Sequence, residues 1–196
     1  MVLASVVGKV GLCQMLAFRH RLPSAVIRRF YTAFIGPKLE YCSAVWCGAS
    51  SSSLRHLERL QLKLAKAITR HWSPQSSPSD ILAAAHMPTL AWRRRLHCLS
   101  LLWQLLHGQG PPQLEGMLPC SAPLFCSSCT LRSGHALEFP LSSTYCHLSS
   151  FLCTTIPVWN SLPSDLASAC SLSSFRFGTS RHFLADQFTF GLQHSP

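Results

Sequence analysis

The stretch that decides the fold is residues 35–71, which begins I-G-P-K-L-E-Y-C-S-A-V-W-C-G-A and runs into a helix-forming segment over 54–71. Apolar residues recur in that segment at spacings of three and four, at Leu54, Leu57, Leu60, Leu64 and Ile68. Basic residues recur one step later, at Arg55, Arg59, Lys63, Lys66 and Arg70. At about 100° per residue the five cations fall within an arc of about 80°. The segment therefore predicts an amphipathic helix with one face on a core and a row of cations opposite, suited to a polyanion.

Helical periodicity continues on both sides of this segment, as far as residue 107. We expect helices over 2–18, 24–35, 38–46, 54–71, 79–85 and 90–107. Ser53 and Thr89 precede two of them and have the side chains that cap helix N-termini. Tyr41 and Trp46 are expected in the core, because large aromatic residues more often pack than stack on bases.

The remainder of the chain is less regular. Residues 108–134 form a connector rich in Ser, Pro and Cys, residues 136–141 suggest a short strand, and residues 172–186 suggest a last helix. The predicted fold is mostly α: a helical bundle followed by a less regular α region with a short β segment. The expected regions are 1–72, a helical extension over 73–107, the connector over 108–134 and a C-terminal region over 135–196.

Charge is distributed unevenly along the chain. The formal net charge is +10, and only 12% of the residues are charged. Residues 1–95 hold 14 of the 17 Lys and Arg residues but 3 of the 7 acids, a net charge of +11. Residues 96–196 carry a net charge of −1. The first half is thus the candidate nucleic-acid surface, to which Arg93, Arg94 and Arg95 add a second basic cluster.

Composition also predicts the cellular setting. With 47% hydrophobic residues the chain can bury a core. Lys9 interrupts the short apolar start, and no run approaches the roughly 18 apolar residues that a membrane span needs. We therefore expect an intracellular protein, in the nucleus, the cytoplasm or both, with reduced thiols, not secreted and without a membrane partner.

Motifs for catalysis are absent from this sequence. No two of the seven carboxylates lie close in sequence, and there is no Gly-rich phosphate loop and no H-E-x-x-H. An alternative hypothesis is a small zinc-binding interaction module with Cys120, Cys126, Cys129 and His135 as ligands. Against it, the C-x-x-C pair lacks a second pair at a standard spacing, so no metal or other cofactor is expected in this chain.

Four blocks, taken in order, give the chain a family resemblance. The first is Gly36-Pro37-Lys38-Leu39-Glu40-Tyr41-Cys42-Ser43-Ala44-Val45-Trp46, and the second is Leu54, Leu57, Glu58, Gln61, Ala65 and Ile68. The third is Leu90-Ala91-Trp92-Arg93-Arg94-Arg95-Leu96. The fourth is Ser150-Phe151 with Trp159-Asn160-Ser161-Leu162-Pro163, followed by Ser174-Phe175-Arg176. In this order they resemble the region after the palm in jockey-like non-LTR retrotransposon (LINE) reverse transcriptases. The resemblance covers nearly the whole chain.

The resemblance implies a thumb plus a C-terminal connector. In that family the thumb holds the template–primer duplex, and the palm carries the polymerase Asp residues and uses Mg²⁺. The palm motif is absent here, so no catalytic residue carries over and the chain alone is not expected to be an enzyme. The implied partners are RNA or an RNA–DNA hybrid, and the missing palm and fingers.

Departures from the family pattern leave one more hypothesis open. The last block of the family is helical where this chain has Pro157, which predicts that the helix starts there. The connector is also unusually rich in Cys and Ser. Such differences are typical of a decayed retroelement relic with no selected activity.

Overall fold

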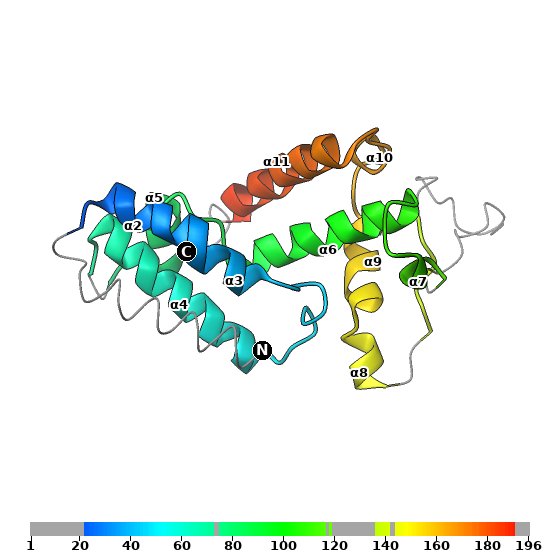
Figure 1. The fold of residues 1–196 in the computed structure, drawn as a ribbon, viewed down its shortest axis with the longest axis horizontal. Coiled ribbons are helices and arrows are strands. Elements are labelled where there is room, and N and C mark those ends of the chain that lie inside the picture. Colours follow the sequence, from blue (N-terminus) through cyan, green and yellow to red (C-terminus); the bar gives the residue numbers. More distant parts are fainter. Residues whose placement is uncertain (1–21, 73–74, 117, 119–135, 142–143, 191–196) are drawn as a thin grey trace. The chain divides into compact units, whose positions relative to one another are not determined.

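The computed structural model describes residues 22–72, 75–116, 118, 136–141 and 144–190 (Figure 1). Within these residues the chain is mostly helical and has no sheet, which confirms the predicted fold class. None of its described helices is both long enough and apolar enough to span a bilayer. The helix expected over 2–18 lies outside the described residues, as does most of the connector, namely residues 117 and 119–134.

The chain divides into two compact units, Met1–Arg94 and Arg95–Pro196. The division falls inside α6, Leu90–Leu106, and therefore inside the region expected as a helical extension. The first unit also contains α2 (Ser24–Phe30), a π turn η1 (Tyr31–Ile35), α3 (Gly36–Glu40), α4 (Ser51–Thr69) and α5 (Pro78–Ala84).

The core of the first unit forms where α2 and α5 pack on α4 (Figure 1). From α4 it takes the apolar stripe expected from the sequence, of which Leu57, Leu60, Leu64 and Ile68 are buried and Leu54 half-buried. Opposite them lie buried residues of α2, η1 and α3 at a spacing of four: Ile27, Tyr31, Ile35 and Leu39. The two stripes face each other, and this contact sets which face of α4 remains outside.

The prediction of a helix over 38–46 is wrong beyond Glu40. α3 ends there, and Cys42 adopts a left-handed backbone with φ of 52°. The indole N–H of Trp46 then donates to the carbonyl oxygen of Tyr41 at 2.8 Å, which closes a turn instead of a helix. Trp46 is half-buried as a result, but Tyr41 is 75% exposed, so the prediction that Tyr41 lies in the core is also wrong.

Helix caps in the first unit follow local sequence. α4 starts one turn earlier than expected, because its N-cap is Ser50 and not Ser53. The hydroxyl of Ser50 accepts the backbone N–H of Ser53. The Thr89 hydroxyl accepts the N–H of Trp92 at 3.2 Å, as expected for the cap of α6.

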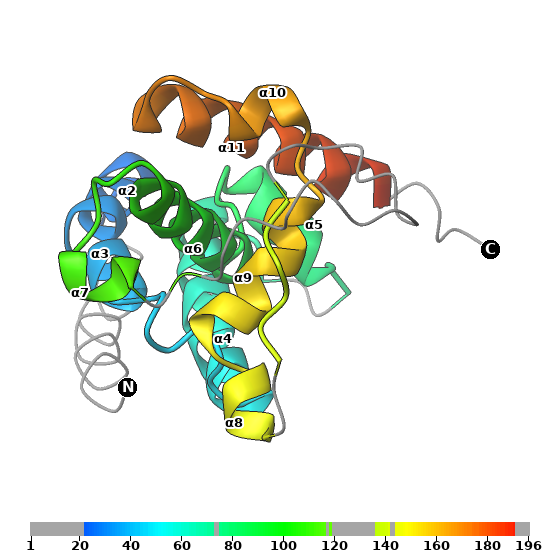
Figure 2. The ribbon, with the colours of Figure 1, turned by 90° about the vertical axis from the view of Figure 1, so that its right-hand side faces the viewer.

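The second unit continues α6 and adds helices that Figure 2 shows in succession. These are α7 (Pro112–Glu115), α8 (Tyr145–Leu148), α9 (Phe151–Asn160), α10 (Ser164–Ala167) and α11 (Leu172–Phe190). α9 begins at Phe151, so the helix start expected at Pro157 is wrong. Pro157 is exposed within α9, where burial of Cys153, Ile156 and Trp159 on the other face offsets the lost backbone donor.

Aromatic residues centre the core of the second unit. The Phe175 ring lies 6.0 Å from that of Trp103 and 5.7 Å from that of Trp159, and all three side chains are buried. The expected strand over 136–141 reduces to one bridge position at Leu137. There the Asn160 side-chain amide donates to the carbonyl oxygen of Leu137 and accepts its N–H, each at 2.9 Å.

Candidate nucleic-acid interface

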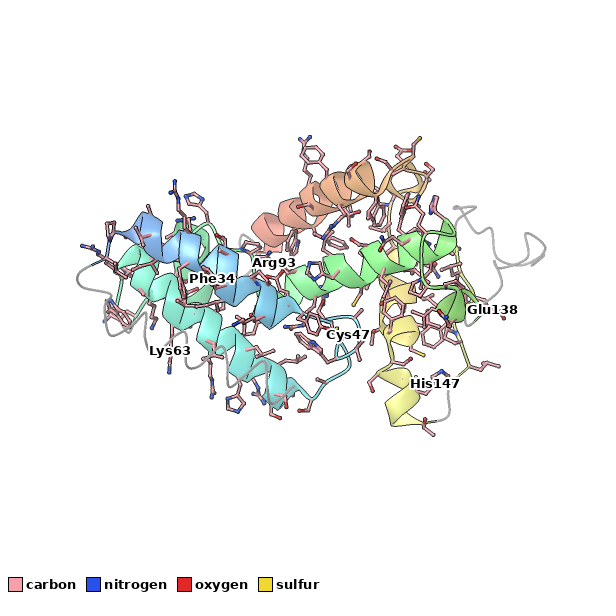
Figure 3. All side chains as sticks on the ribbon, viewed as in Figure 1. Phe34, Cys47, Lys63, Arg93, Glu138 and His147 are labelled. Carbon is pink, nitrogen blue, oxygen red and sulfur yellow. The ribbon has the colours of Figure 1, made fainter. Side chains whose placement is uncertain are left out.

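The basic row of α4 lies on the face opposite its buried stripe. Arg55, Arg59, Lys63 and Arg70 are exposed, and Lys66 is half-buried. In Figure 3 Lys63 projects from the side of α4 that faces away from α2. At 1.5 Å rise per residue the row is about 22 Å long, with neighbouring cations about one turn apart.

The two ends of this row are fixed by backbone carbonyl oxygens. Arg55 Nε donates to Ser51 O at 3.3 Å, and Arg70 Nη2 donates to Leu22 O at 3.4 Å. Arg70 has φ of 55°, so the helix ends at this residue. Between them, Arg59, Lys63 and Lys66 form no ion pair with any carboxylate in the described part of the chain. Their charges therefore face solvent uncompensated by a local acid.

The acid of α4 points away from the basic row. Glu58 Oε1 pairs with Arg94 Nη2 at 3.2 Å, and Glu58 Oε2 accepts the N–H of Leu90 at 3.3 Å. One carboxylate thus pairs with a cation and satisfies an amide at the N-terminus of α6. The Arg94 guanidinium also lies 5.6 Å from the ring centre of Trp46, and its side chain is 9% exposed.

The carboxylate of Glu40 is also paired with an arginine of α6. Arg93 Nε lies 2.9 Å from Glu40 Oε1, and Arg93 is labelled at the start of α6 in Figure 3. Burial raises the pKa of Glu40 above its ordinary value, although the charge and hydrogen bond of Arg93 act in the opposite direction. Glu40 and Glu58 therefore tie the first turn of α6 to α3 and α4.

The eight cations expected to bind nucleic acid fall into three groups. Arg55, Arg59, Lys63, Lys66 and Arg70 share one face of α4. Arg93 and Arg94 are each paired with a carboxylate, and the Arg94 side chain is also buried, so Arg94 is poorly placed to reach a phosphate. Arg95 is exposed and belongs to the second unit. The candidate interface is thus the α4 row.

Gln61 has a role that its place in the sequence blocks did not reveal. It is fully buried, and its Nε2 donates to Pro88 O at 2.8 Å and to Tyr31 Oη at 3.3 Å. The Tyr31 hydroxyl oxygen accepts this bond, and burial raises the pKa of the hydroxyl. The sequence places the amide of Gln61 beside the apolar stripe of α4, which indicates that it is buried but does not indicate its hydrogen-bond partners.

The four residues of the alternative zinc hypothesis lie outside the described residues: Cys120, Cys126, Cys129 and His135. Among the described residues, no three side chains of His, Cys, Asp or Glu gather closely enough to hold a metal ion. No protein-family model, curated protein or solved structure matches this chain.

Proposed function

We propose that this chain binds nucleic acid through the basic face of α4, as a non-catalytic, thumb-like fragment of a non-LTR retrotransposon reverse transcriptase. The observation that carries the proposal is the row of cations on α4, whose only acid, Glu58, is directed at α6. A straight row of cations at one-turn intervals follows a phosphate backbone, and it reads no bases.

The expected ligand is a duplex of RNA and DNA, or RNA itself. Flexible Lys and Arg side chains on a helix face contact phosphates of either strand, so affinity comes from charge and depends strongly on salt. The polymerase chemistry and its Mg²⁺ belong to a palm, which we propose as a partner of this chain. The catalytic step lies outside this sequence.

The test measures binding of the full chain to a blunt RNA–DNA hybrid at a series of salt concentrations. Each phosphate contact contributes about 0.9 to the slope of log affinity against log salt. The double variant Arg59→Gln with Lys63→Gln should therefore flatten the slope by about 2. Fluorescence anisotropy with a labelled hybrid measures both affinity and slope.

A matched control changes the same net charge elsewhere. Arg176 and Arg181 are exposed on α11, and Arg176→Gln with Arg181→Gln should leave the slope unchanged. Equal slopes for both double variants, whether flattened or not, would show that the α4 face has no special role.

A further inference from the structure

The helical path from Ser24 to Glu40 contains an irregular turn. α2 and α3 are joined by the π turn η1, Tyr31–Ile35, in which the N–H of Gly36 donates to Tyr31 O. Pro37 has no N–H, so it cannot donate to the carbonyl of Ala33 and the regular α-helical ladder is interrupted. A π turn within a helix is rare and often coincides with a functional site.

An aromatic pair lies at this turn: Phe34 is exposed, and Phe30, the last residue of α2, is half-buried against the core. The rings of Phe30 and Phe34 lie 5.0 Å apart with 34° between their planes. Phe34, labelled in Figure 3, is 56% exposed, and Val26, one turn before Phe30, is 45% exposed. The core contacts of this helical path are made by Ile27, Tyr31, Ile35 and Leu39, with Phe30 partly buried against them, and Phe34 is not part of this core.

Cations accompany this aromatic pair, and acids do not. Arg29 precedes Phe30, Lys38 lies one turn beyond Phe34, and both are exposed. The one carboxylate on the path, Glu40, is 9% exposed and paired with Arg93. An apolar protein partner would gain nothing from these cations. A ligand with flat aromatic rings and negative charge at each repeat uses both features, and unpaired nucleotides have this chemistry.

We propose that Phe30 and Phe34, with Arg29 and Lys38, form a stacking platform for a single-stranded segment of nucleic acid. The platform is separate from the α4 row: Phe34 stacks with an unpaired base and the two cations contact the flanking phosphates. The proposal rests on the proposed function in that the ligand is nucleic acid, and it adds a second surface that selects unpaired nucleotides.

The experiment compares two probes on the full chain: a blunt RNA–DNA hybrid and the same hybrid with a single-stranded RNA overhang. The wild type should bind the overhang probe more tightly. Phe34→Ala should reduce affinity for the overhang probe by roughly 5- to 150-fold, the range found for removal of a stacked aromatic residue, and leave affinity for the blunt probe unchanged. Phe34→Trp should retain the preference, because it keeps a stacking surface.

Phe177→Ala is the matched control, because Phe177 is 67% exposed on α11 and lies beside Arg181. It should leave the overhang preference intact. Equal affinity of the wild type for the two probes, or an equal effect of both alanine variants, would overturn the proposal. The proposal would also be overturned if Phe34→Ala lowered the oligomeric state but kept the preference for the overhang probe. That result would mean that the face with Phe34 binds a second copy of the chain. The α4 variant, Arg59→Gln with Lys63→Gln, tests the proposed function by its binding to the blunt hybrid. That result is independent of the effect of Phe34→Ala on the overhang preference.

Discussion

The cores of the two units of this chain differ in their chemistry. In the first, polar side chains complete the packing of apolar helices: Glu58 with Arg94, and Gln61 with Tyr31. In the second, the stacked rings of Trp103 and Phe175 lie in the core, and the Asn160 amide bonds to the backbone of Leu137. Both units have an apolar core, and in the first an ion pair and a buried amide are added to it.

This difference shows what the sequence blocks of the resemblance do in the fold. Glu40, Glu58 and Gln61 from the first two blocks contact other helices of the first unit. Trp159 and Phe175 from the last block are buried against each other. The blocks mark structural contacts in both units, while the exposed cations of α4 lie between block positions. Binding and folding residues are thus interleaved on one helix.

The largest expected effect is in the aromatic core of the second unit. Phe175→Ala should lower the free energy of unfolding by about 3–5 kcal/mol, because it leaves a cavity beside Trp103 and Trp159. Phe177→Ala, two residues away but exposed, should change it by less than about 0.5 kcal/mol. Urea unfolding followed by tryptophan fluorescence measures both. Similar losses for the two variants would contradict a core centred on Phe175.

A smaller loss is expected when one polar link of the first unit is broken. Glu58→Ala should cost about 2–3 kcal/mol, because it leaves the guanidinium of Arg94 buried and unpaired and removes the acceptor of the Leu90 N–H. The same unfolding measurement applies.

Replacing both partners of this link separates pairing from burial. Glu58→Leu with Arg94→Met should recover part of the loss, since no unpaired charge remains. If the double variant is less stable than the sum of the two single variants predicts, the link stabilises the unit in some other way.

The smallest effect concerns pH. Because the pKa of Glu40 is raised on folding, its contribution to stability is complete below the ordinary glutamate pKa and is lost as pH rises through the raised value. Glu40→Gln removes this titration. The free energy of unfolding of the wild type minus that of the variant should therefore fall as pH rises above about 4, the ordinary glutamate pKa. A difference that rises with pH would mean that pairing with Arg93 outweighs burial.

Local sequence predicted those elements that depend on neighbours along the chain. The stripe at Leu57, Leu60 and Leu64 predicted α4, and Thr89 predicted the start of α6. Predictions failed where a side-chain contact overrides the backbone preference of its segment. Trp46 bonds to Tyr41 O and closes a turn where a helix was expected, and α9 continues through Pro157 because its opposite face is buried.

The sequence by itself determined the opposed faces of α4, since a period of 3.6 residues fixes which side chains share a side of a helix. It did not distinguish the free cations from the paired ones, and Arg59 and Arg94 are equally basic in the printed chain. Tertiary structure decided this, because Glu58 lies 36 residues before Arg94 and meets it only when α6 starts beside α4. The sequence does not indicate which acid a given cation pairs with. Only the packing of the helices therefore shows which cations are exposed for binding and which are paired inside the unit.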